Sequence, residues 1–224
     1  MVSLVIDTAT RFCGTCIFDA GADRVLAAIE EEIGRGHAER LPGMIIEVMN
    51  KAAIGFNALT GITATIGPGS FTGIRVGVAA ARGFALARDL SVTGVTTLET
   101  LAVQVRAEAG PDGPFAVLIG GGRGQVFLQH FGGNVEALDA AQAVPETDIA
   151  PHIRSDATLL AGDAAKRTGM SRPMVADRPV GTIEAVARAA LCFSRPPTPL
   201  YLRGADAKPQ AGFALPRQAG ARIP

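Results

Sequence analysis

The stretch MVSLVIDTATRFCGTCIFDAGADRVLAAI, residues 1–29, decides the fold of this chain. It contains three short apolar runs, at residues 2–6, 14–18 and 24–29, and a turn rich in Asp, Gly and Ala separates the last two at residues 19–23. Short apolar runs bounded by turn residues are typical of strands, and a brief turn joins antiparallel neighbours. The sequence therefore predicts an antiparallel meander of three strands.

Helices and strands alternate after this meander. Residues 37–51, 72–88 and 97–108 are expected to form helices, and residues 61–66 and 91–95 are expected to form strands. In the first helix the apolar residues recur at a helical spacing that places them on one face; they are Leu41, Met44, Ile45, Val48 and Met49. This order of elements indicates an α/β ribonuclease-H-like lobe, the half-unit of the actin, sugar-kinase and heat-shock-protein (ASKHA) fold.

A second lobe follows a break in the chain. Residues 109–114, AGPDGP, have the composition of a linker. Beyond them the sequence predicts a smaller and more irregular lobe, with strands at 115–119, 125–131, 136–140 and 157–161 and a helix at 182–193. We therefore expect an ASKHA fold of two ribonuclease-H-like lobes, with residues 1–109 in the first and residues 110–224 in the second.

Composition excludes several classes of function. The 224 residues carry 21 basic and 21 acidic side chains, and a protein that binds nucleic acid by itself usually has a basic excess. The N-terminus shows no secretory pattern, and the longest apolar stretch, residues 74–90, is interrupted by arginines and is not expected to span a membrane. Three cysteines are too few for a disulfide framework. We expect a globular, cytoplasmic protein.

Asp7, Thr8 and Thr10 directly follow the first strand. An actin-class protein places its first phosphate loop at this point, with an acidic residue near the metal ion and hydroxyls near phosphate. A hairpin turn in which the same side chains cap backbone amides is the other interpretation. Because no partner motif accompanies these residues, the turn is favoured over nucleotide contact.

Residues 67–75, GPGSFTGIR, invite comparison with a phosphate-binding loop. A P-loop has Lys and then Ser or Thr after its last glycine, but Ile74 and Arg75 stand there. The glycine spacing also differs from that of a dinucleotide-binding fingerprint. We interpret the run as a tight turn that leads into a helix and lets another backbone come close.

Candidate metal ligands and catalytic groups are scattered along the chain. Cys13 and Cys16 form a CxxC without a second pair, so zinc is not expected there. The histidines and the acidic residues in turn-like contexts fit no metal-binding or acid–base spacing; they are His37, His130, His152, Asp7, Asp163 and Asp206. We therefore expect no metal, no cofactor and no catalytic residue in this chain.

The helix at residues 72–88 is apolar on almost all sides. Two adjoining apolar stripes leave a narrow polar edge for Arg75 and Arg82; the stripes are Ile74, Val78, Ala81, Ala85 and Gly73, Gly77, Ala80, Phe84. Such a helix must be covered nearly all round. Either it lies in the middle of its own fold, or it packs on its own sheet with one face and on a helix of another chain with its small-residue face.

The longer motifs resemble those of the TsaB (YeaZ) family, subunits of the bacterial tRNA threonylcarbamoyladenosine complex. They cover most of the chain in the family's order: IDTAT at 6–10, GHAERLPGMI at 36–45, GPGSFTGIRVGVAAARGFALA at 67–87, GVTTLETLA at 94–102, LAGDAA at 160–165 and PLYLRGADAKPQ at 199–210. The resemblance implies a scaffold subunit that performs no carbamoyl transfer. Its implied partners are the catalytic relative TsaD and the ATPase TsaE, with tRNA reached only through the complex.

The resemblance also makes the first two helices the partner-facing surface. The implied contact residues are Leu41, Met44, Ile45, Val48, Gly73, Arg75, Gly77, Ala80 and Phe84, with Gly77 where helix backbones approach closely. A homodimer of the isolated chain through this face, and a nucleotide at a subunit junction, are further expectations.

The chain departs from the family pattern at residues 119–126. The segment reads Ile-Gly-Gly-Gly-Arg-Gly-Gln-Val, whereas many members have Asp-Ala-Arg before the second-lobe hairpin. Loss of this carboxylate weakens the expectation of nucleotide binding in the chain's own cleft. An actin-class small-molecule kinase, the main alternative, would need a second acidic loop and a catalytic carboxylate. A metallopeptidase would need a histidine pair, and the sequence shows neither set.

Overall fold

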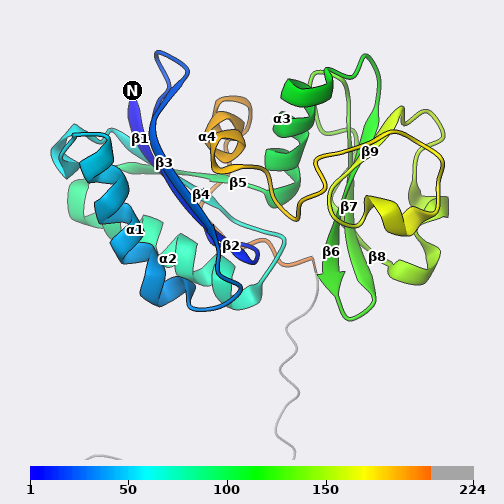
Figure 1. The fold of residues 1–224 in the computed structure, drawn as a ribbon, viewed down its shortest axis with the longest axis horizontal. Helices are drawn as coiled ribbons and strands as arrows, with labels where there is room; N and C mark the ends of the chain where they lie inside the picture. The colour runs from blue at the N-terminus through cyan, green and yellow to red at the C-terminus, as the bar shows by residue number, and fades with distance from the viewer. Residues whose placement is uncertain (203–224) are drawn as a thin grey trace, which may run out of the picture.

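The computed structural model describes residues 1–202 of the chain. This part contains two five-stranded sheets and four α-helices, which Figure 1 shows as successive layers along the molecule. Within residues 1–202 no helix is both long enough and apolar enough to cross a membrane. Asp206, one of the acidic residues considered above, lies outside the described residues.

The predicted meander forms one side of the first sheet. β1 (Val2–Asp7), β2 (Phe12–Asp19) and β3 (Arg24–Glu32) pair antiparallel in sequence order. β4 (Gly61–Thr65) pairs parallel with β1, and β5 (Ser91–Val95) pairs parallel with β4. The strand order is therefore β3-β2-β1-β4-β5, with the almost fully buried β1 at the centre.

The second sheet repeats this topology with shorter outer strands. β6 (Phe115–Gly122) pairs antiparallel with β7 (Gln125–Phe131), which pairs antiparallel with β8 (Gln142–Pro145). On the other side of β6, β9 (Leu159–Ala161) and then β10 (Met174–Val175) run parallel. The order β10-β9-β6-β7-β8 matches that of the first sheet strand for strand. The chain therefore has the predicted α/β fold of two ribonuclease-H-like lobes.

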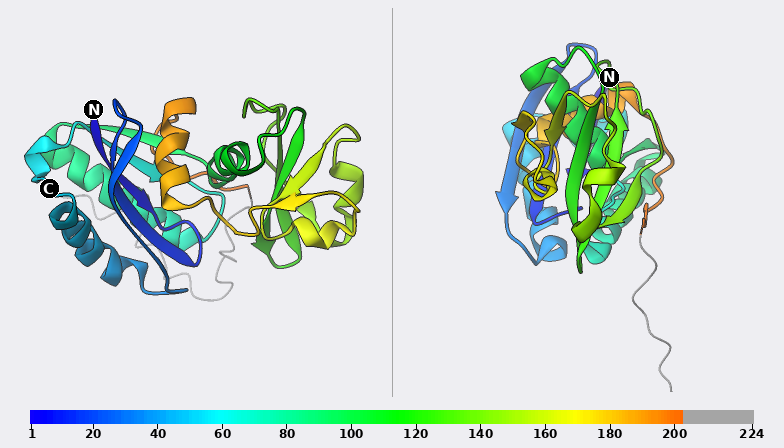
Figure 2. Two further views of the ribbon diagram at one scale, coloured as in Figure 1. Left: turned by 45° about the horizontal axis from the view of Figure 1, so that its top comes forward. Right: turned by 90° about the vertical axis from the view of Figure 1, so that its right-hand side faces the viewer.

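Helices cover the first sheet on both sides. α1 (His37–Lys51) and α2 (Phe71–Arg88) lie on its outer face, whereas α3 (Thr97–Ala109) and α4 (Ile183–Cys192) lie side by side between the two sheets (Figures 1 and 2). Short 3-10 turns follow β8 and β9 where the first lobe has α1 and α2; they are η2 (Glu146–Asp148), η3 (Ala150–His152) and η4 (Ala165–Thr168). A further turn, η1 (Phe56–Ala58), precedes β4.

Each inner helix packs against the sheet of the other lobe. Leu101 of α3 shares a hydrophobic core with Phe131 of the second sheet. Val186 of α4 shares a core with Phe18 of the first sheet. Packing therefore divides the chain differently from the predicted boundary at residue 110, because the helix that ends each half of the sequence completes the opposite lobe.

One predicted strand does not form. The sequence predicts it at residues 136–140, whereas β8 begins later, at Gln142. The Asp139 carboxylate accepts a hydrogen bond from the backbone N–H of His130 at 2.9 Å and lies 2.6 Å from His130 Nδ1. A side chain thereby satisfies the amide that a strand ladder would have used. The prediction of a strand at this point is wrong.

Candidate functional site

The candidate phosphate loop begins at Asp7, the last residue of β1. Asp7 is buried, and its Oδ1 accepts hydrogen bonds from Thr65 Oγ1 and from the backbone N–H of Ala9, the latter at 3.1 Å. Its Oδ2 has no hydrogen-bond partner within residues 1–202. Burial raises the pKa of Asp7 from 3.8 to about 6, against the opposing effect of the Thr65 hydrogen bond. The fold therefore disfavours the charged form of this carboxyl group.

The hydroxyls of the loop are engaged within the chain. Thr8 Oγ1 donates a hydrogen bond to the carbonyl oxygen of Gly73 at 2.7 Å. Thr10 Oγ1 accepts one from the backbone N–H of Phe12 at 3.3 Å. Bonds to backbone two residues away, made by Thr10 and by Asp7, are typical of a turn, whereas the Thr8 bond ties the loop to the first turn of α2. The structure thus places Asp7, Thr8 and Thr10 together after β1, with the local bonds of a turn at Asp7 and Thr10.

The glycine-rich turn before α2 presses against the same loop. A Cβ atom on Gly69 would lie 2.1 Å from the carbonyl oxygen of Ala9, and one on Gly73 would lie 2.1 Å from that of Thr8. Real Cβ atoms do not come so close to a backbone oxygen, so a side chain at either position would force the segments apart. The close backbone approach predicted for this run is therefore made to the chain's own β1 loop.

A cleft of about 360 Å³ lies between the two lobes beside this loop. Within residues 1–202 its lining includes one carboxylate, that of Asp163, whose Oδ1 accepts a hydrogen bond from the N–H of Gly120 at 2.9 Å. Arg11 also lines the cleft, with Nη1 3.8 Å from Asp163 Oδ2 and Nε donating to Glu32 at 2.7 Å. The described lining thus offers no pair of carboxylates for acid–base chemistry.

The candidate metal ligands do not converge. Residues 1–202 contain no group of three or more His, Cys, Asp or Glu side chains that could hold a metal ion. Cys13 belongs to the core beneath α1, whereas Cys16 belongs to the core beneath α4. Residues three apart on a strand point to opposite faces, so the CxxC does not bring two thiols to one site. His37 Nε2 lies 3.1 Å from the carbonyl oxygen of Phe12.

We expect one of the three thiols to react in the folded chain. Burial raises the pKa of Cys13 to about 12 and raises that of Cys16 as well, whereas Cys192 is exposed. Because the thiolate is the reactive form, iodoacetamide should label Cys192 alone in the native protein and all three cysteines in denaturant. Peptide mass spectrometry identifies the labelled sites. Native labelling of Cys13 or Cys16 would contradict their burial.

The structure separates the nine residues expected to contact a partner into a buried group and a surface group. Six of the nine expected contact residues are buried within the chain; they are Leu41, Met44, Ile45, Val48, Gly73 and Gly77. A Cβ atom on Gly77, for example, would lie 2.5 Å from Thr8 Oγ1 of the chain's own β1 loop. α1 and α2 use these six residues to pack within their own lobe, so the residues do not lie on the surface of the described chain.

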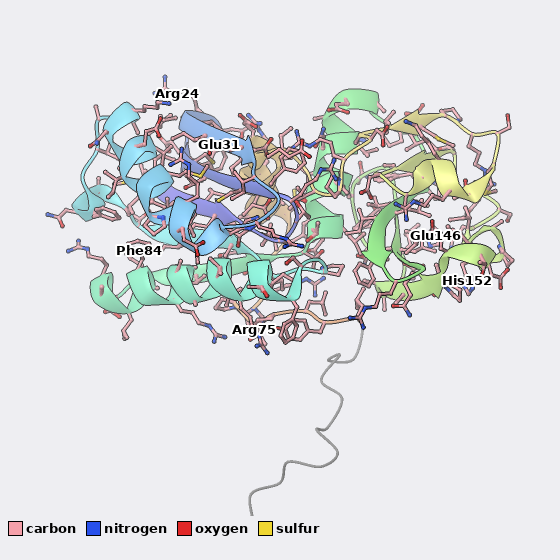
Figure 3. All side chains as sticks on the ribbon, turned by 60° about the horizontal axis from the view of Figure 1, so that its bottom comes forward. Arg24, Glu31, Arg75, Phe84, Glu146 and His152 are labelled. Atoms are coloured by element: carbon pink, nitrogen blue, oxygen red, sulfur yellow. The ribbon has the colours of Figure 1, made fainter. Side chains whose placement is uncertain are left out.

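The other three expected contact residues reach the surface. Ala80 and Phe84 are half-buried and border the core beneath α1 and α2, and the Phe84 ring stacks on Phe56 with centroids 5.6 Å apart. Arg75 is exposed and projects from α2 on the side away from α1 (Figure 3). For Arg75, Ala80 and Phe84, contact with a partner stays a prediction.

Sequence reasoning missed most of the outermost residues of these helices. Exposed side chains of α2 recur at i, i+4, i+7 and i+11, and we call this set the outer row of α2: Arg75, Ala79, Arg82 and Leu86. Leu86 is 88% exposed, and Ile46 on α1 is 58% exposed. Arginines mark the solvent side of an otherwise apolar helix, so Arg75 and Arg82 were the signal that could have located the row.

Fold and cleft together define a class of protein. Two ribonuclease-H-like lobes with a cleft between them are the architecture of the ASKHA class. The chain is similar to a solved structure from Pseudomonas aeruginosa, described as an uncharacterized protein with similarity to peptidase YeaZ. The TM-score is 0.78 and the identity 24%, over 90% of this chain and 99% of that one. This likeness establishes the fold alone.

Sequence comparison identifies the family. The family model TsaD, tRNA N6-adenosine threonylcarbamoyltransferase, matches residues 28–157. The tRNA threonylcarbamoyladenosine biosynthesis protein TsaB of Escherichia coli is 34% identical over 44% of this chain, and that of Bacillus subtilis is 30% identical over 66%. These matches span 42% and 62% of the two relatives, less than two thirds of their length. The chain belongs to the TsaB (YeaZ) branch of this family.

Proposed function

We propose that this chain is a non-catalytic subunit in the biosynthesis of threonylcarbamoyladenosine next to the anticodon of tRNA. It acts by binding a TsaD-type catalytic subunit through the outer surfaces of α1 and α2. A TsaE-type ATPase and the tRNA join through that complex. The observation that carries this proposal is the outer row of α2, which no part of residues 1–202 covers, whereas the opposite side of the helix is buried against the chain's own sheet and β1 loop.

Exposed apolar side chains support a partner at this surface. Leu86 and Ile46 are the large apolar residues that α2 and α1 expose beyond half of their surface. An isolated exposed leucine is ordinary, but large apolar residues exposed on each of two neighbouring helices are consistent with an interface. The TsaD family model matches residues 28–157, which include α1 and α2. A TsaD-type subunit is therefore expected to have counterparts of both helices, and four helices can pack as a bundle.

The cleft supports a role without catalysis. The carboxyl group of Asp7 is buried, and the carboxylate of Asp163 is already bonded to Gly120 and close to Arg11. An actin-class kinase would need a free carboxylate to accept the proton of its substrate hydroxyl, and no observation favours that alternative. We propose that the chain holds no nucleotide of its own, and that any nucleotide lies at a subunit junction.

Disrupting the outer row should abolish function without unfolding the chain. We expect Leu86→Glu to weaken binding to a TsaD-type subunit of the same organism about 10- to 100-fold, because a contact the size of a leucine contributes about 1.5–3 kcal/mol. A pull-down with the tagged partner measures binding. Nucleoside mass spectrometry of tRNA treated with the reconstituted assembly measures the modification, which should fall in parallel.

Leu191→Glu provides the matched control. Leu191 is 52% exposed on α4, away from the outer row, so the same substitution should leave partner binding and tRNA modification unchanged. Equal losses for the two variants, or full binding by Leu86→Glu, would refute the assignment of this surface. Modification by the chain without any partner would refute its non-catalytic role.

A further inference from the structure

α2 carries charge of a single sign. Its 18 residues include Arg75, Arg82 and Arg88 but no Asp or Glu, although the chain as a whole has 21 basic and 21 acidic side chains. Arg75 and Arg82 lie two turns apart in the outer row, whereas Arg88 ends the helix outside it. None of the three forms an ion pair within residues 1–202. An unpaired row of one sign is suited to a surface of the opposite sign.

Arg75 is held in position by its own chain. Its guanidinium carbon lies 3.7 Å from the centre of the Phe71 ring, and its Nε donates a hydrogen bond to Tyr201 Oη at 3.0 Å. The two rings are 4.9 Å apart. Tyr201 follows Leu200, whose N–H donates to the carbonyl oxygen of Ile66 at 2.7 Å. An arginine fixed in this way loses little side-chain entropy when it binds.

The fixed guanidinium still has two nitrogen atoms to offer. Its face rests on Phe71 and its Nε is bonded to Tyr201, while Nη1 and Nη2 have no partner within residues 1–202. A pair of N–H groups in this geometry matches the two oxygens of a carboxylate. Arg82 presents a second guanidinium seven residues further on, about 10.5 Å along the helix axis.

We propose that Arg75 and Arg82 bind two carboxylates, seven residues apart, on a helix of the TsaD-type partner. The inference rests on the proposed function and names the chemistry by which the partner is recognised. Arg75 is the anchor, because Phe71 and Tyr201 preorganise it, and arginine and tyrosine are common among the residues that dominate interface energies. A helix packed alongside α2 would repeat its contacts at the same seven-residue interval.

A carboxylate of the partner fits this row better than RNA or a second copy does. RNA binding rests on several phosphate contacts, and the outer row supplies two cations in a chain without net charge. A second copy that packed its own α1 and α2 here would offer only the glutamates of α1, Glu39 and Glu47, because α2 has no acidic residue. Glu47 is already within ion-pair distance of Arg40 and Lys51. An acidic helix of another protein needs only two cations, and its carboxylates are not already paired within this chain.

Charge substitutions in the row test the proposal. The affinity of the full chain for the TsaD-type subunit of the same organism is measured by calorimetry at several salt concentrations. We expect Arg75→Ala to raise Kd about tenfold or more, and Arg75→Glu and Arg82→Glu to raise it further through repulsion. Tyr201→Phe, which removes the hydroxyl that fixes Nε, should raise Kd about threefold. Arg75→Ala should also reduce the salt dependence of Kd.

Arg88→Glu makes the same charge change on the same helix outside the row, and it should leave Kd unchanged. All these side chains are exposed, so every variant should stay folded, with small changes in melting temperature from the lost Arg75 contacts and from the charge at the helix end. An Arg75→Glu variant that binds as tightly as the wild type would overturn this inference and leave the proposed function standing. Failure of the wild type to bind would overturn both. Loss of self-association or of RNA binding, with partner binding intact, would overturn the choice of a partner carboxylate.

Discussion

Replacing Gly73 with alanine is expected to lower the free energy of unfolding by about 1–3 kcal/mol, the range found for overpacked positions. The added Cβ would lie 2.1 Å from the carbonyl oxygen of Thr8, so one backbone segment must move. Thr8 is buried, and its Oγ1 is bonded to the carbonyl oxygen of Gly73 at 2.7 Å, which resists that movement. The loss should appear even though alanine favours a helix interior by about 1 kcal/mol. Urea denaturation followed by circular dichroism measures it.

Gly83 on the same helix supplies the matched control. A Cβ atom there would meet no described atom within 4 Å, so Gly83→Ala should raise the free energy of unfolding by about 0.5–1 kcal/mol through helix propensity alone. The same chemical change at two glycines of α2 is therefore expected to act with opposite sign. A Gly73→Ala variant as stable as the wild type would contradict the packing of α2 on the β1 loop.

Asp7→Asn is expected to stabilise the chain near neutral pH and to have little effect in acid. Burial raises the pKa of Asp7 from 3.8 to about 6, so between these values the folded state keeps a proton that the unfolded state has released. This proton contributes to the free energy of unfolding in full below 3.8, the pKa of Asp7 in the unfolded chain. The contribution is lost as the pH rises through about 6, its pKa in the folded chain. The shift corresponds to about 3 kcal/mol, and asparagine avoids this loss because it carries no charge.

The difference in free energy of unfolding between the wild type and Asp7→Asn reports on Asp7 alone, since the two proteins share every other titrating group. Denaturation of each at intervals from about pH 3.5 to about pH 8 should show the advantage of Asp7→Asn growing by about 3 kcal/mol across that range. Thr65→Val, which removes a hydrogen bond to Asp7 Oδ1, should make the wild-type pH dependence steeper. A difference independent of pH would show that Asp7 ionises in a solvated site.

Much of the fold could be predicted from local pattern. The helix at residues 37–51 was predicted with the bounds of α1, and the strand at 91–95 with those of β5. Both predictions succeed because apolar spacing is set by the geometry of a single element. Boundaries can be local as well: in α3, Thr96 and Glu99 form a reciprocal capping box that fixes where the helix begins.

The candidate surface could be predicted only in part. The resemblance pointed to the two helices on which we base our proposal, but it named residues that the chain buries, such as Met44 and Gly77, as contacts. Apolar periodicity shows that a helix has a face to cover without showing what covers it. Here the sheet of the same chain covers the apolar face, and only the tertiary structure shows this. The exposed Leu86 looked like any other apolar position in the helix.

The sequence by itself determined the order of strands and helices in the first lobe, the two-lobe class and the family, because these rest on periodicity, turn residues and motifs along the chain. Only the tertiary structure decided which lobe each inner helix completes, that the Thr8 hydroxyl bonds to Gly73, and that Arg75 is fixed by Tyr201. Such contacts join residues far apart in the sequence, 126 positions in the case of Arg75 and Tyr201. No local spacing records them, because they exist only once both sheets and their helices have packed.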